Sequence, residues 1–253
     1  MIVAGRELET QLLKARGAGR EPTVVLLHEG LGSLGLWRDV PEQLARRTGL
    51  AVLTYSRYGN GFSEVLREPR TPRYMHDEAL VVLPELLDAH AVRDVVLVGH
   101  SDGASIALIF AASHPDRISA LVLEAPHVFV EDLSIRSIAA AKRAYEAGDL
   151  RTKLARHHRD VDRTFYGWND IWLDPSFRDW NIETYARDLR CRTLVVQGSD
   201  DEYGTPAQIE SIRAAASGAR IDTLLLANCG HSPHRDHPAP TLDAIASFLT
   251  RGG

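Results

Sequence analysis

The sequence is poor in cysteine and has no long hydrophobic segment. Two cysteines, Cys191 and Cys229, are too few for a disulfide framework or a structural zinc site. The longest uninterrupted apolar run, Ile106–Ala112, is far shorter than the roughly 20 residues that cross a bilayer. The segment Met1–Gln11 carries charged side chains and lacks the apolar centre of a secretory signal. These absences predict a cytoplasmic protein that does not bind membranes.

Basic residues neither dominate the sequence nor gather in one block. Lys and Arg number 29 against 34 Asp and Glu, so the formal net charge is −5, which argues against a nucleic-acid partner. The sequence has no G-x-x-x-x-G-K loop and no dinucleotide fingerprint, so no cofactor is expected. The histidines lack the spacing of a metal site. The adjacent His157 and His158 would point about 100° apart on a helix, which favours a solvated surface. We expect no metal and a small-molecule substrate as the partner, and the sequence leaves homo-oligomerisation open.

Short apolar runs rich in β-branched residues recur between turn residues, as expected for strands that are covered on both faces. The runs are Thr23–Leu27, Leu50–Tyr55, Val95–Val98, Ile118–Leu123, Thr193–Val196 and Ile221–Leu226. Segments with helical spacing lie between or after them, at Met75–His90, Ala104–Ser113 and Leu242–Leu249, and Pro84 predicts a kink in the first. This alternation predicts an α/β fold with a mostly parallel central sheet and helices on both faces.

One segment, residues 127–190, interrupts the alternation. It is helix-prone at Ile135–Ala147 and then rich in aromatic side chains, including every tryptophan except Trp37. A connection between neighbouring strands needs only a few residues, so we interpret the segment as a small helical insertion over one end of the sheet. Residues 1–126 and 191–253 then form the core. The alternative is a pair of ordinary covering helices joined by a long loop.

The motif Gly99-His100-Ser101-Asp102-Gly103 carries the strongest chemical signal. It fits G-x-S-x-G and lies between a predicted strand and a predicted helix. A sharp strand-to-helix turn exposes the serine oxygen, and glycines two positions to either side avoid the Cβ clashes of such a turn. The alternative is a glycine-bounded turn with an incidental serine. We take Ser101 as the candidate nucleophile.

A serine nucleophile needs a base, because its hydroxyl is weakly nucleophilic at neutral pH. Three histidines lie close together near the C-terminus: His231, His234 and His237. His231 follows the last predicted strand through a loop in which Gly230 lets the chain turn back over the sheet. The other two lie nearer the last predicted helix. We therefore predict that His231 is the base.

The base needs an acid that orients it. Between the serine and the histidine, the run Asp200-Asp201-Glu202 follows the strand Thr193–Val196. A carboxylate there would hold the imidazole in the required tautomer and stabilise its protonated form. We predict Asp201 as the acid, with Asp200 in reserve. The alternative for such a run is a solvated turn or the cap of a following helix.

The tetrahedral intermediate needs N–H donors. One is expected from the backbone of Asp102, directly after the nucleophile. The other is expected from the loop His28–Ser33, which follows the strand Thr23–Leu27 and contains two glycines. Glycine lets a backbone approach a ligand closely. Gly30 is the predicted donor, with Leu31 behind it.

Glu29 places a carboxylate beside this predicted donor. An ionised carboxylate about 5 Å from the oxyanion would cost roughly 3 kcal/mol at an effective dielectric constant of 20. We expect the side chain to turn away and to accept hydrogen bonds from loop N–H groups, or to pair with an arginine such as Arg57. The alternative is that it reaches the pocket and holds a substrate hydroxyl or amine, or positions water.

Together these features resemble the α/β-hydrolase fold family. The segments that carry the resemblance follow the family's order over nearly the whole chain: His28-Glu29-Gly30, Ser56–Ser63, Gly99–Gly103, Gly198–Asp201 and Gly230-His231. The resemblance implies a core sheet of about eight strands, with residues 127–190 as a cap domain. It also implies Ser101, Asp201 and His231 as nucleophile, acid and base. The chain departs from the family at Glu29, where glycine is usual after the histidine.

The resemblance favours a serine hydrolase that cleaves a small carboxylic ester, lactone or related acyl compound. Carbon–carbon bond hydrolysis or lyase chemistry with the same groups is an alternative, and a non-catalytic small-molecule receptor is a third, because a fold does not determine a function. Serine at position 101 argues against dehalogenases and epoxide hydrolases, which carry aspartate there. The candidate substrate-binding residues are Glu29, Leu31, His127, Trp168 and Trp172.

Overall fold

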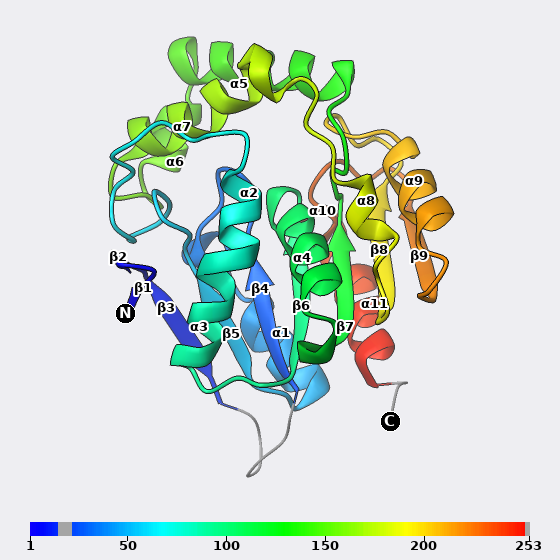
Figure 1. Cartoon of the computed structure of the whole chain (residues 1–253). Helices are drawn as coiled ribbons and strands as arrows, with labels where there is room; N and C mark the ends of the chain where they lie inside the picture. The colour runs from blue at the N-terminus through cyan, green and yellow to red at the C-terminus, as the bar shows by residue number, and fades with distance from the viewer. Residues whose placement is uncertain (15–21, 251–253) are drawn as a thin grey trace.

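A seven-stranded sheet forms the centre of the protein (Figure 1). In this computed structural model, which describes residues 1–14 and 22–250, the strand order is β3-β5-β4-β6-β7-β8-β9. The strands are β3 (Thr10–Leu13), β4 (Thr23–Leu27), β5 (Val52–Tyr55), β6 (Val95–His100), β7 (Ile118–Glu124), β8 (Arg192–Gly198) and β9 (Ile221–Leu226). Every neighbouring pair is parallel except β3 and β5. The predicted α/β fold with a mostly parallel sheet is confirmed.

The edge strand β3 and the short strands β1 (Ile2–Val3) and β2 (Arg6–Glu7) were not predicted, whereas the other strands of the central sheet lie where the apolar runs predicted them. None of the β3 side chains is fully buried, so this segment lacks the continuous apolar character of a strand covered on both faces. The resemblance implied about eight strands, and the described residues form seven in the central sheet. The strands β1 and β2 form a separate antiparallel pair that precedes it.

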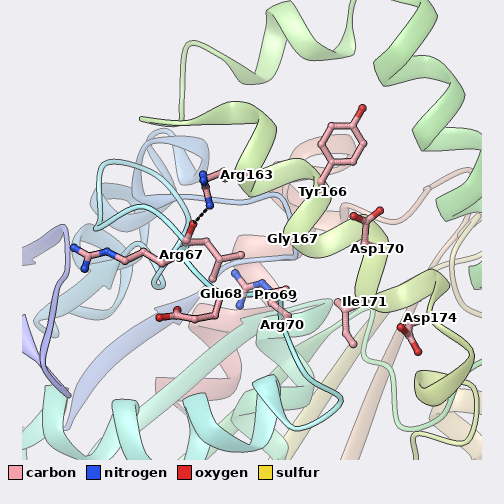
Figure 2. A pocket seen from close by; sticks show the side chains of 11 residues that line it. Arg67, Glu68, Pro69, Arg70, Arg163, Tyr166, Gly167, Asp170, Ile171 and Asp174 are labelled. Carbon is pink, nitrogen blue, oxygen red and sulfur yellow. Dashed lines mark hydrogen bonds between the residues drawn. The ribbon is translucent and has the colours of Figure 1, made fainter.

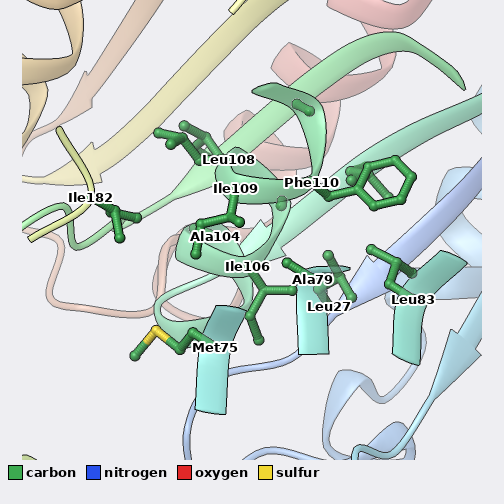
Figure 3. Close-up of a cluster of buried hydrophobic side chains, with 14 of the residues drawn as sticks. Leu27, Met75, Ala79, Leu83, Ala104, Ile106, Leu108, Ile109, Phe110 and Ile182 are labelled. Carbon is green, nitrogen blue, oxygen red and sulfur yellow. The ribbon is translucent and has the colours of Figure 1, made fainter. Parts of the chain in front are cut away.

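Helices cover both faces of the sheet, and each face has its own apolar core. On one face pack α1 (Val40–Thr48) and α11 (Pro238–Thr250). On the other, α4 (Asp102–Ser113) packs against α2 (Tyr74–Asp77), and Figure 3 shows Ile106 of α4 beside Met75. The remaining short elements are η1 (Leu34–Trp37), α3 (Leu83–Ala89), η3 (Pro115–Arg117), α8 (Glu183–Ala186), α9 (Ala207–Ala215) and α10 (Pro233–Asp236). The two apolar cores pack against opposite faces of the sheet and support the loops at its carboxyl edge.

The helix predicted over residues 75–90 is present but is interrupted before its proline. A π-helical turn, Glu78–Val82, separates α2 from α3, and Pro84 is the second residue of α3. Proline lacks the N–H of a helix interior and its ring clashes with the carbonyl four residues earlier. In the first turn of a new helical segment the missing N–H costs little. The predicted kink is therefore a wider turn, Glu78–Val82, that ends two residues before Pro84.

Between β7 and β8 the chain forms a group of helices above the carboxyl ends of the strands (Figure 1). They are α5 (Asp132–Ala147), α6 (Leu150–Leu154), α7 (Val161–Leu173) and η4 (Pro175–Phe177). A single β-bridge between Phe129 and Asn181 brings the two ends of this excursion together. The following α8 packs against α4 and α9 instead, so the last part of the segment 127–190 lies against the core. Stacked aromatic rings fill the space between α5 and α7. The ring centroids of Tyr145 and Phe165, for example, lie 3.7 Å apart.

Direct contacts attach α7 to the loop that follows β5. Arg163 donates a hydrogen bond to the Leu66 carbonyl over 3.1 Å, and Thr164 donates to the Gly59 carbonyl over 2.6 Å. A Cβ on Gly167 would lie 2.5 Å from Leu66 Cδ2, so glycine allows the close approach. A hollow of about 280 Å³, rimmed by charged side chains, lies along this junction (Figure 2). These contacts fix the helical excursion over one end of the sheet.

Candidate active site

The sharp turn predicted around Ser101 is present. β6 ends at His100, Ser101 adopts φ 54° and ψ −118°, and α4 begins at Asp102. A Cβ on Gly99 would lie 2.3 Å from the Gly103 carbonyl oxygen, and one on Gly103 would lie 2.0 Å from the Leu27 carbonyl oxygen. Both positions therefore exclude a side chain. The glycines let the strand, the turn and the helix pack closely enough to raise the serine above the sheet.

Ser101, His231 and Asp201 form a continuous series of hydrogen bonds. Ser101 Oγ lies 2.9 Å from His231 Nε2, and His231 Nδ1 lies 2.8 Å from Asp201 Oδ1. The Asp201 carboxylate also accepts hydrogen bonds from the N–H groups of Tyr203 and Gly204. Burial alone would raise the pKa of Asp201, but the hydrogen bond and charge of His231 and the Tyr203 N–H outweigh it, so this pKa lies below its usual value. The carboxylate is thus ionised and points at the imidazole.

The alternative histidines and acid lie elsewhere. His234 is buried, and its Nδ1 lies 2.8 Å from Glu124 Oε2. His237 Nε2 lies 3.0 Å from the Asn228 carbonyl oxygen. The Asp200 side chain is exposed and accepts a hydrogen bond from the neighbouring serine hydroxyl. Of the three histidines and two aspartates considered, the structure brings only His231 and Asp201 together with Ser101.

The loop predicted to supply an oxyanion donor forms a tight turn. The Gly32 N–H donates to the Glu29 carbonyl, so the N–H groups of Gly30 and Leu31 lie inside the turn and outside its hydrogen bond. Asn60 Nδ2 donates to the carbonyls of Gly30 and Gly32, each over 3.0 Å, and fixes the turn. Asp102 begins α4, where a backbone N–H has no partner within the helix. Both predicted donors therefore remain available to a ligand.

A cavity of about 220 Å³ opens beside Ser101. Its wall includes all five predicted substrate-binding residues, namely Glu29, Leu31, His127, Trp168 and Trp172. It also includes residues that no sequence motif singled out, namely Leu36, Ile138, Leu150, Leu154, Tyr203 and Arg235. The Trp168 ring lies so close to Gly30 that a Cβ there would be 2.1 Å from it. The lining is largely apolar, with a few polar groups near the serine.

The Glu29 carboxylate is paired with an arginine, but with Arg235 rather than Arg57. Its Oε1 accepts a hydrogen bond from Arg235 Nη2 over 2.8 Å, and its Oε2 lies 3.6 Å from His100 Nδ1. Burial alone would raise the pKa of Glu29, yet the charges of Arg235 and His100 hold it well below the usual value. Arg57 instead donates to the Glu29 backbone carbonyl over 2.8 Å. The prediction that the Glu29 carboxylate pairs with an arginine is therefore confirmed. The suggestion that this arginine is Arg57 is wrong.

His100 connects this carboxylate to the candidate base. Its Nε2 lies 2.7 Å from the His231 carbonyl oxygen and therefore donates to it. Burial alone would lower the pKa of His100, but the contact with Glu29 and its charge outweigh burial and raise it. Sequence reasoning treated His100 only as the variable position of the motif. No local sequence pattern predicts the contact between His100 and His231, which lie 131 positions apart.

His158 is not on a solvated surface as expected. It is 4% exposed, accepts a hydrogen bond from the Gly61 N–H at Nδ1 over 2.9 Å and contacts the Leu31 carbonyl through Nε2 at 3.0 Å. With Nδ1 accepting, the proton is on Nε2, which donates to Leu31. Burial lowers the pKa of His158 to about 4. His157 and His158 lie between α6 and α7 and not on a helix, so the helical angle did not apply and the expectation was wrong.

Replacing Glu29 by glutamine is expected to reduce stability more than turnover. The change removes a charge-assisted hydrogen bond, a loss of about 1.5–3 kcal/mol in the free energy of unfolding. Because the folded-state pKa of Glu29 is depressed, this contribution is present above the unfolded-state pKa and disappears as the pH falls through the folded-state value. Chemical denaturation of the wild type and of Glu29→Gln between pH 7 and pH 3 measures whether their free energies of unfolding become equal as the pH falls. We expect kcat to stay within about tenfold, 1.4 kcal/mol of barrier. A hundredfold lower kcat at an unchanged Tm would contradict an anchoring role.

The comparisons with known proteins agree with this geometry. The family model described as alpha/beta hydrolase fold matches residues 22–159. The chain belongs to the α/β-hydrolase fold family. A curated relative, the mouse sn-1-specific diacylglycerol lipase ABHD11, is 28% identical over 256 residues, covering 90% of this chain and 81% of the relative. The 2-hydroxymuconate semialdehyde hydrolase of Pseudomonas sp. (strain CF600) is 27% identical, covering 87% of this chain and 83% of the relative.

Solved structures of α/β-hydrolases superpose over nearly the whole chain. A hydrolase from Pseudomonas aeruginosa PA01 gives a TM-score of 0.74 at 25% identity, covering 99% of this chain and 97% of that one. The similar proteins are hydrolases with different substrates. Membership of the family therefore supports a hydrolase without naming what this α/β-hydrolase cleaves.

Proposed function

We propose that this chain is a serine hydrolase that cleaves a small carboxylic ester, lactone or related acyl compound. Ser101 Oγ attacks the carbonyl carbon while His231 Nε2 takes its proton. The oxyanion accepts hydrogen bonds from the N–H groups of Gly30 and Asp102. His231 then protonates the leaving oxygen, the carbon–oxygen bond breaks, and an acyl-enzyme remains. A water molecule, deprotonated by His231, releases the acid and restores Ser101.

The hydrogen-bond series from Ser101 through His231 to Asp201 carries this proposal. The three groups come from three separate loops, each after the carboxyl end of a strand, and meet at distances of 2.9 and 2.8 Å. A serine on an incidental turn needs no such partners. The series also disfavours the receptor alternative, because a binding protein gains nothing from an oriented base beside a hydroxyl.

The cavity supports a small acyl substrate with little net charge. Apolar side chains of the helical excursion, among them Ile138 and Leu154, face the serine across about 220 Å³. The cationic Arg235 in the wall is already paired with Glu29. We propose that the excursion within residues 127–190 acts as a cap that sets the size and polarity of the substrate. No metal site enters the proposal, and in the described ranges no cluster of metal-ligating side chains occurs.

Carbon–carbon bond hydrolysis is the second candidate function. One observation favours it: the relative named 2-hydroxymuconate semialdehyde hydrolase is 27% identical over most of both chains. The same nucleophile and base would serve, but the leaving atom would be a carbon that must be protonated. The two candidates therefore differ in the leaving group and not in the residues of the site.

Incubation with p-nitrophenyl butanoate and, separately, with a vinylogous diketone distinguishes the candidates. We expect continuous release of p-nitrophenol at many equivalents per enzyme and no cleavage of the diketone. Efficient cleavage of the diketone with poor ester turnover would favour the second candidate. Stoichiometric binding of either compound without turnover would favour a receptor.

Asp201 and Asp200 provide a matched pair of variants for the proposed acid. Asp201→Asn should lower kcat by roughly 10⁴-fold, because the amide stabilises the wrong histidine tautomer. Asp200→Asn removes an exposed carboxylate that does not contact His231 and should lower kcat far less. Steady-state hydrolysis of the p-nitrophenyl ester measures both. Equal losses would show that the loop was disturbed and that neither carboxylate is the specific partner.

The compartment and the partners remain predictions. No helix within residues 1–14 or 22–250 is long and apolar enough to cross a membrane. We propose a cytoplasmic enzyme that acts on a small molecule without a nucleic-acid or membrane partner. Cell fractionation with detection of the native chain tests the compartment, and light scattering of the purified protein tests whether it forms a homo-oligomer.

A further inference from the structure

His127 is a buried histidine whose ring nitrogens form no hydrogen bond with any of the residues that the structure describes. It follows β7, is 2% exposed and lines the cavity beside Ser101. The Ser105 hydroxyl donates to its backbone carbonyl over 2.6 Å, and its ring packs edge-on against Trp172 at 5.2 Å. In the part of the chain that the structure describes, neither ring nitrogen forms a hydrogen bond with a protein group, and Nδ1 is completely enclosed. The ring is therefore held in place by packing while its hydrogen-bonding capacity is free.

The surroundings of the ring define which hydrogen bond it offers. Burial, with the neighbouring charge of His231, lowers the pKa of His127 to about 4, so the imidazole is neutral at neutral pH. A neutral imidazole has one N–H and one lone pair. Because a buried N–H without an acceptor is less tolerable than an unused lone pair, the proton belongs on Nε2 and not on the enclosed Nδ1. Nε2, unlike Nδ1, is not completely enclosed, and His127 lines the cavity, so Nε2–H is the donor that this side chain can offer to a neutral acceptor.

The position of the ring relative to His231 indicates which part of a substrate it meets. The two ring centroids are 5.5 Å apart. In the proposed mechanism His231 Nε2 protonates the leaving oxygen, so the alcohol portion of an ester lies next to His231. Atoms a few bonds beyond the leaving oxygen are then within reach of His127.

We propose that His127 is a specificity-determining residue that donates a hydrogen bond to an oxygen in the alcohol portion of the substrate. The substrate class is an ester whose alcohol carries an ether, carbonyl or hydroxyl oxygen two or three bonds from the ester oxygen. This inference rests on the proposed function, because it needs Ser101 as the nucleophile. A buried polar group that pairs with the substrate disfavours an analogue that lacks the acceptor, since the group then stays unpaired.

A pair of nearly isosteric esters tests the proposal. Butyl butanoate and 2-methoxyethyl butanoate share their acyl group and differ by one methylene replaced by oxygen. We compare the ratio of their kcat/KM values, methoxyethyl over butyl, in the wild type and in His127→Phe. Phenylalanine keeps the ring packing on Trp172 and removes the donor. The ratio should fall roughly three- to tenfold, the net effect of one neutral hydrogen bond.

His114→Phe is the matched control. His114 lies at the far end of α4 from Ser101, stacks on Phe110 and does not line the cavity, so its replacement should leave the ratio unchanged. If the ratio in His127→Phe equals that of the wild type, including the case in which kcat/KM falls equally for both esters, the proposal is overturned. If His127→Phe does not fold, product inhibition of the wild type decides: 2-methoxyethanol should inhibit more strongly than butanol, and equal inhibition overturns it. Failure of the proposed function looks different, because either the wild type would hydrolyse neither ester or Ser101→Ala would still hydrolyse both.

Discussion

Replacing Ser101 by alanine is expected to abolish hydrolysis of p-nitrophenyl butanoate and to leave the protein folded. Removing the nucleophile of such a group costs up to about a million-fold in kcat, although a residual rate above that of water can persist. The backbone at position 101 has φ 54°, which alanine tolerates no worse than serine, since both carry a Cβ. The hydroxyl makes its side-chain hydrogen bond to His231, at the edge of the cavity. Steady-state kinetics together with thermal unfolding measures the two effects separately.

Covalent labelling gives the same prediction a second readout. A fluorophosphonate should modify the wild type once, on the peptide that contains Ser101, because the reagent needs an activated serine beside oxyanion donors. The alanine variant should remain unlabelled. A variant that is still labelled and still turns over the ester would refute both the nucleophile and the proposed function. A folded, inactive variant whose wild-type parent is labelled at another serine would reassign the nucleophile.

The parts of the fold that local chemistry determines were predictable from the sequence. Continuous apolar runs located the strands from β4 to β8, because strands that are covered on both faces have apolar side chains at nearly every position. The run Ile221–Leu226 located the edge strand β9, although none of its side chains is fully buried. The edge strand β3 was missed because it is only four residues long, its two middle side chains are both exposed, and among the described strands it pairs with β5 alone. The π-helical turn before Pro84 escaped for a different reason. A proline predicts that a helix is disturbed, but not which turn absorbs the change.

In the candidate site, too, some residues could be predicted from the sequence and others could not. Ser101, His231 and Asp201 could be selected because each follows a strand on a loop with turn residues, and parallel strands bring such loops to one edge of the sheet. Which loop residues touch across that edge is not encoded in any local pattern. Arg235 meets Glu29 from 206 positions away, and His158 meets Leu31 from 127 positions away. Both contacts depend on how two segments pack over the sheet, namely the helical excursion that contains His158 and the segment after β9 that contains Arg235.

Replacing His231 by alanine should match the loss in the Ser101 variant, because residues that act as one catalytic unit are not additive. Without the imidazole, Ser101 has no base to take its proton. The loop should persist, because the Asp201 carboxylate keeps its bonds from the N–H groups of Tyr203 and Gly204. A double variant of Ser101 and His231 should be no slower than either single one. Additive losses would show that the two residues act independently.

His234→Ala is the control for this prediction, because it should lower stability and leave turnover nearly unchanged. His234 is buried with Nδ1 2.8 Å from Glu124 Oε2, and removing a hydrogen bond to a charged group costs about 1.5–3 kcal/mol in the free energy of unfolding. It does not reach Ser101, so we expect His234→Ala to unfold much more easily yet to keep kcat within about tenfold while folded, since a residue outside the reaction supplies no transition-state stabilisation. His231→Ala should show the reverse, a folded protein without turnover. An active His231→Ala beside an inactive but folded His234→Ala would exchange their roles, and the hydrogen bond between His231 and Ser101 would then have no part in catalysis.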